Sequence, residues 1–181
     1  MKNLVLLCCM GFILNTHAQE RYLTRAGQIN FEASVPSFEP VAAESNSATA
    51  ILDPATGEVA ALILVKAFRF ENALMEEHFN ENYAESSQYP KAKFEGKLDG
   101  FSMESLSETP EVFALHGDLF FHGVTKSVEI PVKISQKEEN ILLRADFILS
   151  PSDFKIKIPG IVRKKVAKEV NVSIKFKLEK Q

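Results

Sequence analysis

The sequence contains no tryptophan, three tyrosines and two cysteines, against 14 phenylalanines in 181 residues. Phenylalanine carries no polar group that needs a partner, so an excess of it suits a dry core or an apolar cavity. Both cysteines, Cys8 and Cys9, lie in the first apolar run. A chain processed beyond them has no thiol left for a disulfide. A domain of this length can be stable on its core alone, because it buries roughly 70% of its unfolded surface.

Long apolar runs are also scarce. The one at the N-terminus, Leu4 to Leu14, follows Lys2 and precedes the small-x-small sequence Thr16-His17-Ala18. This arrangement is typical of a secretory signal peptide, and its apolar run is too short to span a bilayer. We predict that residues 1–18 are a signal peptide removed after Ala18. Residues 19–181 then form one soluble domain, exported to the periplasm or the extracellular medium.

A strong charge of one sign is absent as well, since 24 acidic and 21 basic residues give a net charge of −3. This balance provides no electrostatic footprint for nucleic acid, and we expect no such partner. One stretch is locally basic. It could contact anionic lipid head groups or a ligand phosphate, or be a solvated loop balanced by acids elsewhere, which we favour. Its cations are Lys155, Lys157, Arg163, Lys164, Lys165 and Lys168.

The clearest periodicity runs from Glu111 to Ile134. Apolar residues recur at every second position up to Phe121, and again from Val128 to Ile134. Between these runs lies His122 to Lys126, a turn that contains a glycine. Period-two patterning on both sides of such a turn predicts a β-hairpin with one apolar face.

The rest of the chain predicts more strands and a single helix. The helix, Ala73 to Tyr83, has apolar residues at helical spacing and Asn72 as a suitable N-cap. We expect Ala43 to Asn46 to be a loop. The other predicted strands are Tyr22–Arg25, Gln28–Val35, Thr49–Leu52, Glu58–Phe70, Ala92–Leu98, Ile141–Leu149 and Val170–Leu178.

This order of elements predicts an all-β fold. It is a single antiparallel barrel of about eight strands, with one short helix after the fourth or fifth strand. A barrel of that size can hold one small ligand. The predicted strand Glu58–Phe70 is apolar on both faces. We therefore expect apolar groups against both sides, such as a helix outside and a ligand or core inside.

Two motifs resemble those of the YceI-like lipid/polyisoprenoid-binding family. The segment 73–83, followed by Tyr89-Pro90-Lys91-Ala92-Lys93-Phe94, is similar to its helix and Y-P-x-x-x-F sequence. The segment Gly117 to Lys126 is similar to its G-x-L-x-x-H-G-V-T-K hairpin. The order and spacing agree, and the likeness extends from Tyr22 to the final strand. The chain departs from the family pattern at two places. Many members have Arg-Asp before the helix histidine, where this chain has Glu76 and Glu77. Many also have a Trp near the start of the domain, which this chain lacks, with Tyr22 nearby.

The resemblance implies an extended lipocalin-like β-barrel of exported bacterial proteins. Its elongated apolar pocket takes an isoprenoid chain, such as a quinone or polyprenyl lipid, or another long amphiphile. No catalytic residues belong to the family pattern, and no cofactor is implied beyond the bound lipid.

The residues themselves give little sign of catalysis or metal binding. No G-x-S-x-G sequence is present, and the paired carboxylates lie in stretches expected to be solvated. His116 and His122 are separated by roughly 20 Å if both lie on one strand, so they cannot share a metal. His78 lies on the predicted helix and could approach only one of them. We predict structural histidines and no enzymatic activity.

We therefore predict a non-catalytic exported protein that holds a long-chain isoprenoid or similar amphiphile inside a barrel. The alternative is a structural or interaction domain whose own phenylalanines fill its core. Membrane-surface contact is compatible with either, and the sequence leaves the oligomeric state open. The side chains predicted to line the cavity, by period alone, are Phe31, Leu62, Leu64, Phe68, Phe70, Leu74, Phe94, Leu119, Phe121, Ile130, Val132 and Phe147.

Overall fold

The computed structural model describes residues 20–36 and 38–181. The predicted signal peptide and both cysteines therefore lie outside the described residues. The strands are β1 (Tyr22–Glu32), β2 (Ala42–Leu52), β3 (Glu58–Leu64), β4 (Arg69–Phe70), β5 (Lys91–Leu98), β6 (Glu111–Phe121), β7 (Val124–Lys137), β8 (Asn140–Leu149) and β9 (Val170–Lys180).

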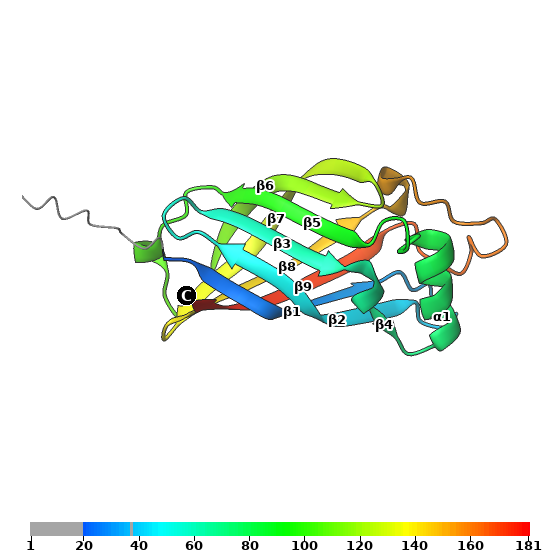
Figure 1. Cartoon of the computed structure of the whole chain (residues 1–181), viewed down its shortest axis with the longest axis horizontal. Coiled ribbons are helices and arrows are strands. Elements are labelled where there is room, and N and C mark those ends of the chain that lie inside the picture. The colour runs from blue at the N-terminus through cyan, green and yellow to red at the C-terminus, as the bar shows by residue number, and fades with distance from the viewer. Residues whose placement is uncertain (1–19, 37) are drawn as a thin grey trace, which may run out of the picture.

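The strands form one antiparallel sheet that closes on itself (Figure 1). Each strand pairs with its neighbours in the order β1-β9-β8-β7-β6-β5-β3-β2, and β1 also pairs with β2. The two-residue β4 adds to the start of β2. The helix α1 (Ala73–His78) follows β4 and precedes β5. The predicted fold is confirmed, because these eight strands make a closed barrel with one short helix.

The predicted hairpin is confirmed as β6–β7, but its turn is tighter than predicted. Phe121 pairs directly with Val124, so only His122 and Gly123 lie in the turn. Both have positive φ, at 48° and 73°, which is the backbone of the two-residue turns that match strand twist. Val124 to Lys126 already belong to β7 and not to the turn.

Several boundaries differ from those predicted. The two strands predicted at Tyr22–Arg25 and Gln28–Val35 form the single strand β1, which ends at Glu32. Residues 43–46 are not a loop, because β2 begins at Ala42 and pairs with β1 through Ile29↔Ser45 and Phe31↔Ala43. The predicted strand Glu58–Phe70 is interrupted by the 3₁₀ turn η1 (Val65–Ala67). In residues 43–46, pairing with β1 overrides the weak strand propensity of a stretch that contains Ser and Asn.

One half of the barrel is filled by side chains. Tyr22, Leu52, Leu98, Phe113 and Leu178 are at most 6% exposed and lie near the end where β1 begins and β9 finishes. At the opposite end the strands stop at connecting segments and α1 (Figure 1). We call this second end the mouth. A core packed at one end gives the barrel a closed base.

The helix at the mouth begins at a defined cap. The Asn72 side chain accepts hydrogen bonds from the backbone N–H groups of Leu74 and Met75, at 2.9 and 3.3 Å. After His78 the chain continues as one π-helical turn, η2 (Phe79–Tyr83). The predicted helix and its cap are confirmed, with its second half in a wider helical form. Within the described part of the chain, no helix has the length and apolar character needed to cross a membrane.

Candidate functional site

The barrel contains a cavity of about 610 Å³ between the packed base and the mouth. This volume falls within the usual range for ligand pockets. Its wall is made by inward-facing side chains of most strands, together with α1, η2 and the segment that follows β8. The polar residues on the wall are few: Glu39, Asn72, His78, Tyr83, Lys93 and Lys165.

Four phenylalanines form a cluster where the cavity meets the helix. The Phe31 ring lies 5.1 Å from that of Phe68, 5.6 Å from Phe70 and 5.3 Å from Phe79, measured between centroids. Phe79 also contacts Phe70 at 5.2 Å. Several of these pairs meet edge to face, which is a favourable arrangement of aromatic quadrupoles. The cluster packs the underside of the helix and forms one wall of the cavity.

Most of the predicted lining residues border this cavity. They come from β1, β3, the segment around β4, the helix, and β5 to β8. Phe31 and Phe94 project into the barrel with their strands. Ligand contact by these side chains stays a prediction. The predicted residues on the cavity wall are Phe31, Leu62, Phe68, Phe70, Leu74, Phe94, Leu119, Phe121, Ile130 and Phe147.

The prediction was wrong for Leu64 and Val132. In β3 the buried face carries Val59 and Ile63, each 4% exposed, while Leu64 is 51% exposed. Leu62 shares the face of Leu64 and only borders the cavity. The prediction treated Glu58–Phe70 as one strand, but η1 breaks the period, so Phe68 points inward and Leu64 outward. A shift of one residue inverts a strand.

Val132 has the predicted orientation but a different environment. It is fully buried and absent from the cavity wall, packed in the core with Phe113 opposite it on β6. The expected cover on the outer face of β3 is also absent from the described residues, since the helix caps the barrel end and leaves Leu64 half exposed.

Sequence reasoning missed lining residues in the helix and in one loop. The helical spacing of Met75 and Phe79 predicts that they share the apolar face of the helix. It does not predict that this face borders the cavity. Ile156, Ile158 and Val162 lie in a segment without a strand or helix period, so no local signal placed them. Only their position over the mouth brings them to the cavity.

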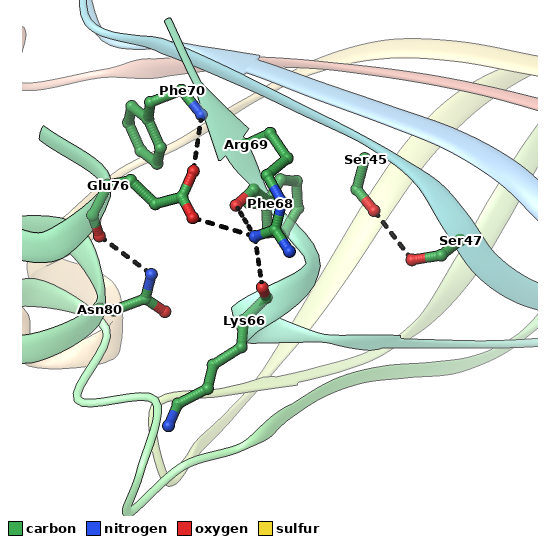
Figure 2. Close-up of polar contacts among 8 residues, drawn as sticks. All are labelled: Ser45, Ser47, Lys66, Phe68, Arg69, Phe70, Glu76 and Asn80. Carbon is green, nitrogen blue, oxygen red and sulfur yellow. Dashed lines mark hydrogen bonds and ion pairs between the residues drawn. The ribbon is translucent and has the colours of Figure 1, made fainter. Parts of the chain in front are cut away.

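The helix is held at the mouth by Glu76 (Figure 2). One carboxylate oxygen accepts from Arg69 Nη1 at 3.0 Å and the other from the backbone N–H of Phe70 at 3.2 Å. Arg69 also donates to the carbonyls of Lys66 and Phe68. Glu76 thus joins α1 to β4 and keeps the helix against the phenylalanine cluster. The residue that differs from the common motif has a structural role here.

The His122-Gly123-Val124-Thr125-Lys126 motif holds a second segment of the mouth. His122 Nδ1 donates to the carbonyl of Phe154 at 2.8 Å, and its Nε2 lies 2.7 Å from a carboxylate oxygen of Glu85. Lys126 forms an ion pair with Asp153. Both contacts fix η4 (Pro151–Phe154), whose Phe154 is 1% exposed. The motif therefore positions the start of the loop that covers the cavity.

Comparison with protein families agrees with this architecture. The model of the YceI-like domain matches residues 23–178. The chain belongs to the YceI-like domain family. The resemblance seen in its two motifs is confirmed. Among curated protein sequences, none matches this YceI-like chain.

Three solved structures illustrate the fold of this YceI-like domain. A polyisoprenoid-binding domain from Saccharophagus degradans, implicated in plant cell wall breakdown, superposes with a TM-score of 0.78 at 13% identity, covering 90% of this chain and 99% of that one. Burkholderia cenocepacia BcnA gives 0.68 at 18% identity, covering 84% and 94%. The Campylobacter jejuni YCEI protein gives 0.54 at 19% identity, covering 72% and 80%. At these identities the likeness shows the fold.

We expect Glu76→Ala to loosen the helix of this YceI-like domain. The substitution removes two acceptor contacts and leaves Arg69 without its carboxylate, so stability falls by about 1–2 kcal/mol. Hydrogen exchange of residues 73–83 should accelerate. The neighbouring Glu77→Ala is the matched control, because Glu77 is exposed. Equal exchange in the two variants would contradict the role given to Glu76.

We expect His122→Ala to release the start of the loop. The His122 side chain is 9% exposed and contacts both Phe154 and Glu85. Its loss leaves a buried carbonyl without a donor, at a cost of about 1–3 kcal/mol. Trypsin should then cleave faster at the basic residues between 155 and 168. His78→Ala is the control, since His78 is exposed on the helix. Unchanged cleavage in the His122 variant would refute this role.

His116 and His122 make contacts in different parts of the barrel. His116 contacts Asp99 and Glu129 on the outside of the barrel, while His122 contacts Glu85 at the mouth. Among residues 20–36 and 38–181, no group of three or more His, Cys, Asp or Glu side chains is arranged to hold a metal ion.

Proposed function

We propose that this YceI-like protein binds a long-chain apolar lipid, an isoprenoid or similar amphiphile, inside its barrel. The single observation that carries the proposal is the cavity of about 610 Å³, with its wall of aliphatic and phenyl groups. A core filled by its own side chains would leave no such space. The cavity therefore favours the carrier over the structural domain considered from the sequence.

The expected affinity depends on the length of the chain. At about 0.3 kcal/mol per heavy atom, a 16-carbon tail gains roughly 5 kcal/mol, whereas a 40-carbon isoprenoid could gain roughly 12 kcal/mol. The second value corresponds to a Kd of about a nanomolar. Long chains therefore make useful ligands and short ones do not. The Saccharophagus degradans relative, which shares the fold, is described as polyisoprenoid-binding.

The orientation of the lipid follows from the wall. The apolar tail lies toward the packed base, where the lining is aliphatic and aromatic. The head group lies at the mouth, near the helix residues Asn72 and His78 and the loop residue Lys165. We propose that the protein binds and does not transform its ligand, and that it acts after export, with residues 1–18 removed.

Extraction of the purified protein with organic solvent tests this proposal. Mass spectrometry of the extract should reveal a long isoprenoid or amphiphile in near-stoichiometric amount. If the extract is empty, the protein should take up an added polyprenyl lipid. A protein that carries no lipid and also ignores added isoprenoids would refute the proposal. N-terminal sequencing of the exported protein tests removal of the signal peptide, and the first residue should be Gln19.

A further inference from the structure

A basic loop crosses the mouth between η4 and β9. Residues 155–168 contain six cations and no acidic residue, although the whole chain has a net charge of −3. The loop is held at both ends: Ile156 N–H donates to the Pro151 carbonyl, and Ala167 N–H donates to the Ala33 carbonyl. In Figure 1 it extends beyond the end of the barrel beside α1. The charge is therefore concentrated on one projecting segment.

The loop has two chemically distinct sides. Ile156, Ile158, Val162 and Val166 are half-buried and line the cavity. The six basic side chains are exposed, although Lys165 also borders the cavity. Next to the Pro159-Gly160 pair, Ile161 is 89% exposed, the highest value among the exposed large apolar side chains described. An exposed isoleucine close in sequence to exposed cations, such as Arg163 and Lys164, suits a surface that is both apolar and anionic.

Other exposed apolar side chains gather near the same end. Phe38, Leu64, Leu74 and Ile148 belong to segments or strand ends at the mouth. Val112, near the start of β6, lies toward the opposite end. Exposed apolar side chains are thus more frequent at the end that carries the basic loop, and among them Ile161 belongs to the loop itself, so the loop combines apolar and cationic groups as membrane-surface segments do.

We propose that the basic loop docks this protein on the surface of an anionic lipid bilayer. Ile161 enters the head-group region, and the surrounding lysine and arginine side chains contact lipid phosphates. Lysine and arginine side chains near such a surface are attracted by its negative potential and strengthen binding. Docking brings the mouth to the membrane. This consequence rests on the proposed function: with the mouth at the membrane, an apolar tail can pass between bilayer and cavity with little exposure to water.

The charges on the other side of the mouth set the orientation. Glu71, Glu77 and Glu81 are exposed on and around α1 and η2, and an anionic surface repels them. Asp153 is paired with Lys126, and Glu169 follows the loop. The loop therefore approaches the membrane and the helix side tilts away. A soluble polyanion would use the cations alone and make no use of Ile161.

Cosedimentation with vesicles tests the docking. The vesicles contain phosphatidylcholine with about one-third phosphatidylglycerol, or phosphatidylcholine alone. The loop variant is Lys157→Gln/Arg163→Gln/Lys164→Gln, which leaves every cavity-lining residue intact. The control, Lys133→Gln/Lys137→Gln/Lys175→Gln, removes three exposed cations from the strands and changes the net charge equally. A third variant, Ile161→Ser, removes only the exposed apolar group.

The protein should bind the anionic vesicles, and binding should weaken in high salt. The loop variant should lose at least about tenfold in affinity and Ile161→Ser about tenfold, with the control close to the parent. Absence of binding, equal binding to neutral vesicles, or an equal loss in the control would overturn the proposal. An unchanged Ile161→Ser variant would indicate a general polyanion site and also overturn it.

Failure of docking and failure of the proposed function are distinguishable. Loading of the loop variant with a polyprenyl lipid in solution reports on the cavity and should match the parent. Normal loading with no vesicle binding would refute docking alone. Vesicle binding without loading would refute the carrier function and leave the surface intact. Thermal unfolding of each variant should match that of the parent, because the substituted side chains are exposed.

Discussion

Replacing Ala61 with tryptophan should weaken the binding of a long isoprenoid by about a hundredfold. Ala61 lies on the inward face of β3 and borders the cavity. The indole projects into space that the lipid would occupy and displaces about nine ligand atoms, which costs roughly 3 kcal/mol, or about a hundredfold in Kd. The barrel should remain folded because the cavity has room for the ring.

The neighbouring residue provides the matched control. Ala60 lies on the outward face of the same strand and is exposed, so Ala60→Trp adds the same group outside the barrel. Titration of both variants and the parent with a polyprenyl lipid gives the comparison. Parent-like affinity in the Ala61 variant, with an unaltered fold, would show that the ligand binds elsewhere.

The second large effect concerns stability. Phe31→Ala should lower the free energy of unfolding by about 3 kcal/mol, because Phe31 contacts three other rings in the cluster under the helix. Phe31 is half-buried and faces the cavity, so the loss should fall at the low end of the range for a buried phenylalanine. Phe31→Leu keeps much of the volume and should cost about half as much.

Urea unfolding of the lipid-free protein measures this effect. The midpoint should shift with little change in the slope, since the folded barrel exposes a similar surface in each variant. A loss below about 1 kcal/mol in the alanine variant would mean that the cluster contributes little to the fold. Added lipid should restore part of the lost stability, because a ligand that binds only the folded state shifts the equilibrium.

Several elements were predictable because one local signal decided them. In β6 and β9 the alternation is regular, and the inward residues Phe113, Leu115 and Phe176 follow it. Asn72 is a strong N-cap, and the helix begins directly after it. Each of these signals agrees with the tertiary context, so the local prediction matches the fold.

The orientation of β3 was not predictable in this way. Both of its faces are apolar, and the 3₁₀ turn after Leu64 shifts the phase. Pairing with β2 and β5 decides which face points inward, and those partners are distant in sequence. The positions of Ile156 and Ile158 were not predictable either. They border the cavity after η4, which His122 and Lys126 contact from a part of the chain distant in sequence.

The size of the cavity also could not be predicted from the sequence. It depends on where the packed base ends, and Val132 illustrates this point. Val132 lies on the same inward face of β7 as Ile130, which lines the cavity, yet Val132 is fully buried by other side chains. Volume in a barrel interior is set by all strands together. A pattern read along one strand identifies an inward residue but not the space in front of it.

The central claim is that the hollow half of the barrel accepts a long apolar chain from its mouth. Calorimetric titration with a series of isoprenoid alcohols of increasing length tests it most directly. At about 0.3 kcal/mol per heavy atom, each five-carbon unit should raise affinity by roughly tenfold until the cavity is full. An affinity that is independent of chain length, or no binding at any length, would contradict the account.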